Sequence, residues 1–316
     1  MTMSMLISKP THPFLQIRAS NSHHNSRLLP SKDKVVVVMG ATGTGKSRLS
    51  IDLATQFNGE VVNSDKMQAY EGLDVITNRI TAEESCGVPH HLLGIMHPSA
   101  DFTCTDFCHM ASLAVASIVD RQKLPIIAGG SNSYIESLVD DETSGFRYKY
   151  DCCYLWVDVP MTVLHQIISD RADQMVEKGM VDEARQMFNP NADYSTGIRR
   201  AIGVPEFDNY FRLEARVNEE TREKLLQEAI YQVKINSCKL ACRQQDKILR
   251  LRNDKGWDIQ RLDATDVFLK YGKESNKAWK ELVLKPSMEI ISRFLNSSGP
   301  KLCNSGTLTA MATSTR

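Results

Sequence analysis

The chain reads Val35-Val36-Val37-Val38-Met39-Gly40-Ala41-Thr42-Gly43-Thr44-Gly45-Lys46-Ser47 near its amino end, and this stretch decides the fold. Its last eight residues fit the pattern G-x-x-x-x-G-K-[ST], and they stand between an apolar strand and the start of a helix, as that pattern requires. Glycines let the backbone wrap phosphate oxygens, and the N–H groups at a helix start point at the anion. Lys46 adds a positive charge, and the Ser47 hydroxyl is a ligand for Mg²⁺. The stretch therefore predicts a P-loop, which holds a nucleoside triphosphate or another diphosphate.

Short β-branched runs alternate with helical patterns along the rest of the chain. Strands are expected at Val35–Met39, Glu60–Asn63, Pro125–Ala128 and Tyr154–Val159, with a weaker candidate at Asp258–Leu262. Strands that alternate with helices favour a parallel sheet joined by crossover helices. The predicted fold is therefore α/β, a doubly wound P-loop NTPase-like parallel sheet flanked by helices, with a smaller helical domain.

The apolar period becomes helical after Pro160, which places a boundary there. We expect a P-loop α/β core at 33–160, a helical domain at 161–220, and a long helix with a return to the core at 221–296. The long helix is expected from about Thr221 to Arg252.

Composition excludes several classes of protein. Lysine plus arginine and aspartate plus glutamate each total 38, and no apolar run approaches the ~20 residues that span a bilayer. Outside residues 1–32, 34 basic side chains face 38 acidic ones, without the basic excess of a dedicated nucleic-acid-binding protein. The eight cysteines lack the density of a secreted disulfide scaffold, so we expect free thiols in a reducing compartment.

The two ends of the chain differ from its body. Residues 1–32 hold eight serines or threonines, four basic residues and no acidic ones, which is typical of an organelle transit peptide. An ordinary disordered tail is the alternative. Residues 297–316 are rich in small and hydroxyl side chains and are expected to form a flexible tail.

A carboxylate follows the second predicted strand. Asp65, in Asn63-Ser-Asp-Lys-Met-Gln68-Ala-Tyr70, falls at the carboxyl end of a strand beside the P-loop strand, which is where open α/β sheets bind ligands. Asp65 is a candidate general base, and a P-loop kinase also places an aspartate there to take a proton from a hydroxyl. Capping of the next turn is the structural alternative.

Five motifs in this order resemble those of the isopentenyltransferase family. They are Gly40–Ser47, Ser64–Tyr70, Val88-Pro-His90-His91-Leu-Leu93, Gly129-Gly130-Ser-Asn-Ser133-Tyr134 and Arg200-Ala-Ile-Gly203-Val-Pro-Glu206, within a resemblance that runs from about Val35 to Arg250. The family contains tRNA dimethylallyltransferases and the adenylate isopentenyltransferases of cytokinin synthesis. The segments 130–136 and 198–207 look like the plant adenylate type.

The resemblance implies a reaction and its site. The P-loop of the family holds the diphosphate of dimethylallyl diphosphate, and the prenyl group passes to N6 of a free adenine nucleotide, with ATP or ADP preferred over AMP in the plant type. Asp65 would act as the base and Lys46 would stabilise the leaving diphosphate, with Mg²⁺ on Ser47 as the cofactor. The plant type also implies a plastid location, with the cytoplasm as the alternative.

Further cations are candidates for binding phosphate. Lys239, Arg243, Lys247 and Arg250 share one stripe of the long helix, and relatives carry a similar segment ending in Arg-Gln, which matches Arg243-Gln244. Ser133, Arg199 and Arg200 belong to motifs of the family and are assigned to diphosphate or nucleotide binding with them. A solvated basic face is the alternative for the helix stripe.

Other chemical residues are interpreted as structural. The pair Cys238 and Cys242 and the group Cys104, Cys108 and His109 lack four ligands at zinc spacing, so we expect packing roles. His90 and His91 are expected in a structural loop. Asp158 either imitates a second P-loop carboxylate or caps the helix after Pro160.

Two departures favour a free nucleotide over tRNA as the acceptor. Only about 25 residues separate Tyr134 from Met161, where tRNA enzymes of the family carry an insertion, and no Cys₂His₂ finger follows, since the carboxyl end has only Cys303. No membrane association is expected, and the oligomeric state is left open. A P-loop small-molecule kinase and a nucleotide-binding module without turnover remain the alternatives from other classes.

Overall fold

The computed structural model describes residues 32–141 and 144–297, and its centre is one six-stranded parallel sheet. The strand order is β3-β2-β4-β1-β5-β6. The strands are β1 (Asp33–Met39), β2 (Gly59–Asn63), β3 (His90–His91), β4 (Leu124–Ala128), β5 (Tyr150–Asp158) and β6 (Ile259–Asp263). All neighbouring strands pair in parallel, so their carboxyl ends lie along a common edge.

Helices connect these strands and extend beyond them. The helices of the first half are α1 (Lys46–Gln56), α2 (Cys104–Asp120), α3 (Asn132–Asp140), α4 (Phe146–Lys149) and α5 (Met161–Glu177). Those of the second half are α6 (Met180–Met187), α7 (Asp208–Leu213), α8 (Glu219–Asn253), α9 (Thr265–Leu269), α10 (Gly272–Ala278) and α11 (Lys285–Asn296). Short 3₁₀ turns lie at Met67–Ala69, Gly197–Arg200 and Pro205–Phe207, and a π-helical segment at Trp279–Leu284 joins α10 to α11.

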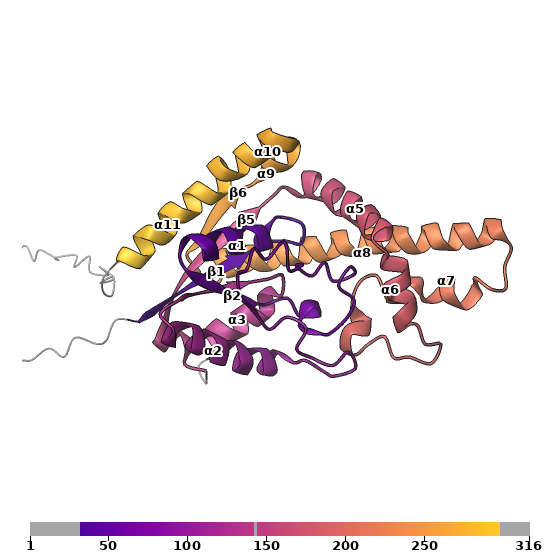
Figure 1. Cartoon of the computed structure of the whole chain (residues 1–316), viewed down its shortest axis with the longest axis horizontal. Coiled ribbons are helices and arrows are strands. Elements are labelled where there is room, and N and C mark those ends of the chain that lie inside the picture. Colours follow the sequence, from indigo (N-terminus) through magenta and orange to yellow (C-terminus); the bar gives the residue numbers. More distant parts are fainter. Residues whose placement is uncertain (1–31, 142–143, 298–316) are drawn as a thin grey trace, which may run out of the picture. The chain divides into compact units, whose positions relative to one another are not determined.

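Strand β1 explains why the sheet is covered on both faces. Its valines are fully buried, and successive side chains point to opposite faces of a strand. Val35 and Val37 join one apolar cluster, with side chains from α2, α3 and α8. Val36 and Val38 join a second cluster, with side chains from α1 and α11. Figure 1 shows α2 and α3 on one side of the sheet and α11 on the other, which is the doubly wound arrangement that the sequence predicts.

The sequence predicted this architecture better than its details. The parallel α/β sheet is confirmed, the weak candidate at 258–262 is strand β6, and the long helix extends to Glu219–Asn253. Strand β3 was missed because two adjacent histidines carry no apolar run. Strand β5 begins at Tyr150, four residues earlier than expected, because its first residues are mostly polar or half-buried. The division of 33–296 into core, helical domain and returning segment stays a prediction.

Several predictions fall outside the described residues. The transit peptide, apart from Lys32, lies there, as does the predicted tail apart from Ser297, together with Cys303. Among the helices in the described part of the chain, none is long and apolar enough to cross a membrane.

Buried Glu60 ties the edge of the sheet together. It lies on β2 with a side chain only 4% exposed, and its carboxylate contacts His91 Nε2 at 2.7 Å, Arg121 Nη2 at 2.6 Å and Lys123 Nζ at 2.8 Å. Burial alone would raise the pKa of Glu60, but hydrogen bonds from these three partners outweigh it and lower the pKa to about 2. The carboxylate thereby joins β2, β3 and the segment between α2 and β4.

We predict that Glu60→Gln destabilises the fold in a pH-dependent way. A carboxyl whose pKa is lower in the folded than in the unfolded chain stabilises the fold above the unfolded pKa and loses that contribution as pH falls through the folded pKa. The variant should lose about 2 kcal/mol at pH 7, and its difference from the parent protein should shrink between pH 4.5 and pH 2. Urea unfolding across this range measures it, with the exposed Glu177→Gln as control. A difference independent of pH would contradict this account.

Candidate active site

The P-loop is the turn from β1 into α1. Gly43 and Gly45 adopt φ angles of +89° and +94°, which side-chain-bearing residues rarely adopt. Inside the loop, the Thr44 hydroxyl donates to the carbonyl of Ala41 at 2.9 Å and Lys46 Nζ donates to the same oxygen at 2.8 Å. A Cβ on Gly45 would also stand 2.9 Å from the ring of Trp279, so the loop is held from outside as well. Its shape is therefore set by the chain itself.

Asp65 lies at the end of β2, opposite the P-loop. Asn63 holds its backbone, since the Asn63 amide accepts from the Asp65 N–H and donates to the Asp65 carbonyl, both at 3.0 Å. The carboxylate oxygen Oδ1 accepts from the Met67 N–H at 3.0 Å. These contacts fix the direction of the carboxyl group.

Burial governs the charges of the site. It raises the pKa of Asp65, although nearby Lys46, the N–H groups of Met67 and Gln68, and then Arg171 oppose that shift. Burial likewise lowers the pKa of Lys46 to about 8, against the attraction of Asp65. Each of the two opposite charges therefore stabilises the charged form of the other.

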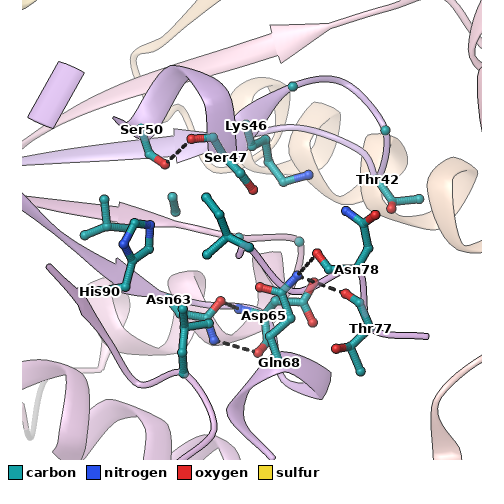
Figure 2. Close-up of a pocket in the computed structure, with 18 of the residues that line it drawn as sticks. Thr42, Lys46, Ser47, Ser50, Asn63, Asp65, Gln68, Thr77, Asn78 and His90 are labelled. Carbon is teal, nitrogen blue, oxygen red and sulfur yellow. Dashed lines mark hydrogen bonds between the residues drawn. The ribbon is translucent and has the colours of Figure 1, made fainter. Parts of the chain in front are cut away.

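Two cavities meet at this point. The first, of about 290 Å³, contains the P-loop and the ends of β2 and β4, and the second, of about 340 Å³, lies toward α5 and α8. Five residues line both: Thr42, Asp65, Thr77, Asn78 and Arg171. Figure 2 shows the first cavity with Lys46 and Asp65 on facing walls and with Thr42 and His90 toward opposite ends. Asp65 is thus accessible from two directions.

The two cavities differ in chemistry. Around the phosphate loop, the first is lined by apolar side chains, among them Val61, Ile80, Leu93 and Ile167. The second combines apolar side chains of α5 and α8 with the cations Lys66, Arg200 and Arg243. None of these three cations forms an ion pair within residues 32–141 and 144–297. Burial lowers the pKa of Lys66, and Arg200 lowers it further, so the second cavity favours an anionic ligand.

The structure gathers some predicted residues and not others. Arg200 and Arg243 line the second cavity, and Thr42, Gly43, Gly45, Lys46 and Ser47 line the first. Gly40, Ala41 and Thr44 belong to the loop but line neither cavity. Ser133 and Lys239 are exposed and line neither cavity, while Arg199 Nε donates to the Met187 carbonyl at 3.4 Å. Lys247 pairs with Glu136 at 2.6 Å, so the helix stripe divides between the cavity and a salt-bridge cluster.

Sequence reasoning missed two residues at the centre. Arg171 on α5 is half-buried, lines both cavities and donates to the Thr42 hydroxyl at 2.7 Å. Gln244 on α8 accepts from the Thr42 N–H at 2.7 Å. No local pattern marks Arg171, because its role depends on how α5 packs, whereas Gln244 stands beside Arg243 in the matched Arg-Gln pair.

The remaining candidates have structural partners. His90 lines the first cavity with Nδ1 2.8 Å from the Val88 carbonyl, and His91 contacts Glu60. Asp158 neither caps α5 nor faces the P-loop cavity, because it accepts from Arg261 at 2.6 Å and from Gln245 at 3.2 Å. The seven cysteines in the described part of the chain are free, and no group of three or more His, Cys, Asp or Glu side chains there forms a metal site.

Comparisons with known proteins agree on one family. The model of the IPP transferase family matches residues 68–146 and 140–248. A protein named adenylate isopentenyltransferase 3, chloroplastic, from Arabidopsis thaliana is 58% identical over 267 residues, which cover 84% of this chain and 80% of the relative. Adenylate isopentenyltransferase 7, mitochondrial, from the same plant is 48% identical over 302 residues, covering 94% and 92%.

A solved structure extends the comparison to the fold. The structure of a eukaryotic dimethylallyltransferase acting on tRNA superposes with a TM-score of 0.69 at 26% identity, covering 84% of this chain and 80% of the other. The sheet and its P-loop are therefore shared well beyond the range of high sequence identity.

We predict that Lys46→Ala weakens the binding of inorganic diphosphate by at least about tenfold, because it removes a charge-assisted hydrogen bond worth about 1.5–3 kcal/mol. Calorimetric titration measures the effect. Lys34→Ala is the matched control, since Lys34 stands at the other end of β1 and pairs with Asp151. Equal affinity of Lys46→Ala and the parent protein would remove the P-loop from diphosphate binding.

Proposed function

Because this chain belongs to the IPP transferase family, we propose that it transfers the dimethylallyl group of dimethylallyl diphosphate to N6 of a free adenine nucleotide, with ATP and ADP preferred over AMP. The observation that carries the proposal is that Asp65 lines both cavities. Transfer between two substrates requires the acceptor nitrogen to meet the reacting carbon of the donor. A general base that lies where the two cavities join can contact the nitrogen at that place. The reaction is a prenyl transfer to adenine and the first step of cytokinin formation.

The donor is assigned to the first cavity. Its diphosphate would lie on the P-loop, where the N–H groups at the start of α1 and the Lys46 ammonium meet the charge that grows on the leaving group. Arg171, which donates to the Thr42 hydroxyl, adds a second cation at this point. The apolar lining that includes Val61, Ile80 and Leu93 accommodates the prenyl tail and keeps water from the allylic carbon.

A divalent metal is expected in this family, and we assign Mg²⁺ to Ser47. The Ser47 side chain lines the donor cavity at the start of α1, whereas no cluster of three metal-ligating side chains exists in the described residues. That donor set fits Mg²⁺, which retains waters and uses substrate phosphates together with one or two protein oxygens. Bound there, Mg²⁺ would neutralise charge on the diphosphate.

The acceptor is assigned to the second cavity. The N6 amine of adenine is a weak nucleophile because its lone pair is delocalised into the ring. Asp65 accepts a hydrogen bond from N6–H and takes the proton as nitrogen attacks the allylic carbon. Apolar side chains of α5 and α8, including Ile168 and Val233, contact the adenine ring. The unpaired cations Lys66, Arg200 and Arg243 bind the phosphates, so phosphate number affects affinity.

The subcellular location of the protein is proposed from the names of its relatives. Two similar plant proteins are named chloroplastic and mitochondrial. Residues 1–32 carry no acidic side chain, and a scarcity of acidic residues is typical of organelle transit peptides. We therefore assign the protein to the plastid, with the cytoplasm as the alternative.

We predict that Asp65→Asn lowers kcat by about 10² to 10⁴, the usual contribution of a general base, with little change in inorganic diphosphate affinity. The amide preserves shape but cannot take the proton. Steady-state transfer from labelled dimethylallyl diphosphate to ATP measures kcat, and single-turnover transfer measures the chemical step alone. Asp170→Asn, the same change on the exposed face of α5, is the control and should match the parent protein. Turnover of Asp65→Asn near the parent value would eliminate Asp65 as the base.

We predict that kcat/KM is higher for ATP and ADP than for AMP or unmodified tRNA at one salt concentration. Replacing Lys66, Arg200 or Arg243 with alanine should reduce the preference for ATP over AMP by about five- to tenfold, since each removes a phosphate contact worth roughly 1 kcal/mol or more. Lys239→Ala, with its side chain outside both cavities, should leave the preference unchanged.

Product identity separates the alternatives in the same assay. Prenylated nucleotide supports the proposal, prenylated tRNA as the preferred product supports the tRNA-modifying alternative, and ADP with a phosphorylated acceptor supports a kinase. Loss of discrimination in Lys239→Ala alone would move the phosphate site to the exposed stripe of α8.

A further inference from the structure

The Gln244 side chain joins two parts of the site that lie on different elements. It is 8% exposed and belongs to α8. Its Oε1 accepts from the Thr42 N–H of the P-loop at 2.7 Å, and its Nε2 donates to the Gly130 carbonyl after β4 at 3.0 Å. One amide thus connects the phosphate loop to the loop at the end of the neighbouring strand.

The second of these loops supports the base. The Ser131 N–H donates to the Ser64 carbonyl at 3.1 Å and the Ser131 hydroxyl accepts from the Lys66 N–H at 3.0 Å, so this loop holds the residues on either side of Asp65. A Cβ on Gly130 would stand 3.3 Å from Asp65 Oδ2 and 2.3 Å from Gln244 Nε2, so both side chains lie close to Gly130. Asn132 also holds α8 next to this loop, because its Nδ2 donates to the Gln244 carbonyl at 3.1 Å. Hydrogen bonds therefore connect Thr42 through Gln244 to the loop after β4, and that loop to the segment that carries Asp65.

The chemistry of this position selects an amide. The Thr42 N–H needs an acceptor and the Gly130 carbonyl needs a donor, and a side-chain amide supplies both at one place. A carboxylate would meet the Gly130 carbonyl with a second acceptor, and an apolar side chain would leave both backbone groups unpaired, at about 1–3 kcal/mol each. Gln244 lines neither cavity, so it acts through its neighbours.

We propose that Gln244 is a positioning residue that sets the distance between the phosphate loop and Asp65, and so aligns the allylic carbon of the donor with the acceptor nitrogen. This inference rests on the proposed function. Effective alignment depends on reacting atoms held at about 3–3.5 Å, and a displacement of about 1 Å costs roughly 10²-fold in rate. Removing the bridge should therefore affect turnover more than the affinity of either substrate.

Three variants test the bridge. Gln244→Ala removes both hydrogen bonds and should lower kcat about 10²-fold, while the affinity for inorganic diphosphate changes less than about threefold. Gln244→Glu keeps size and the acceptor for Thr42 but loses the donor, and should lie between Gln244→Ala and the parent protein. Gln245→Ala is the control on the same helix, because Gln245 contacts Asp158 instead, and should retain the parent kcat.

A double-mutant cycle distinguishes positioning from a merely structural role. If Gln244 acts by aligning Asp65, the double variant Asp65→Asn, Gln244→Ala should turn over within about threefold of Asp65→Asn alone, because the group being aligned is already lost. Additive losses would overturn the inference and leave the proposed function intact. A lower melting temperature with unchanged kcat for the folded fraction would also overturn it. Parent-level turnover of Asp65→Asn would overturn both the base and its positioning.

Discussion

Parallel pairing of β2, β4 and β1 is the constraint on which the site depends. Because the strands run in one direction, the P-loop after β1, Asp65 after β2 and Gly130 after β4 lie on one edge of the sheet. Each loop is short and anchored to a buried strand, so the phosphate-binding backbone and the carboxylate hold a defined separation. The helices α5 and α8 then enclose this edge and supply Arg171, Gln244 and Arg243, while Lys66 comes from the loop after β2 and Arg200 from the 3₁₀ turn at Gly197–Arg200.

Burial gives the opposed charges of the site their effect. Lys46 and Asp65 face each other across the first cavity, and partial burial disfavours the charged form of both. A buried cation without a full complement of partners favours an anion such as a diphosphate. A buried carboxylate whose pKa is raised accepts a proton more readily than an exposed one. Partial burial thus has two effects. It strengthens the attraction of Lys46 for the leaving diphosphate in the first cavity, and it makes Asp65 a better proton acceptor where the two cavities meet.

The sequence predicted those features that are local. The P-loop and its strand are written in contiguous residues, and the alternation of strands with helices implied the parallel sheet, so Lys46, Ser47 and Asp65 could be located before the fold was known. The family resemblance added Arg200 and Arg243, both of which line the second cavity. Strand β3 was invisible because it consists of two histidines held by pairing with β2.

Features that depend on tertiary packing were not predictable in the same way. Their spacing on one face of α8 predicted the same role for Lys239, Arg243 and Lys247. The partner of each cation, however, depends on which element packs against that part of the helix. Lys247 forms an ion pair with Glu136 of α3, and Lys239 is exposed. Arg171 occupies the centre of the site because α5 packs across the P-loop, and no spacing within α5 distinguishes it from its neighbours.

The most direct test of the central claim is the structure of a ternary complex with ADP and a dimethylallyl thiolodiphosphate, which reacts slowly. The account predicts the thiolodiphosphate on the P-loop, its prenyl tail in the first cavity, and adenine N6 within about 3 Å of Asp65 from the second. A structure with the phosphates of ADP on the P-loop, or with adenine remote from Asp65, would contradict it.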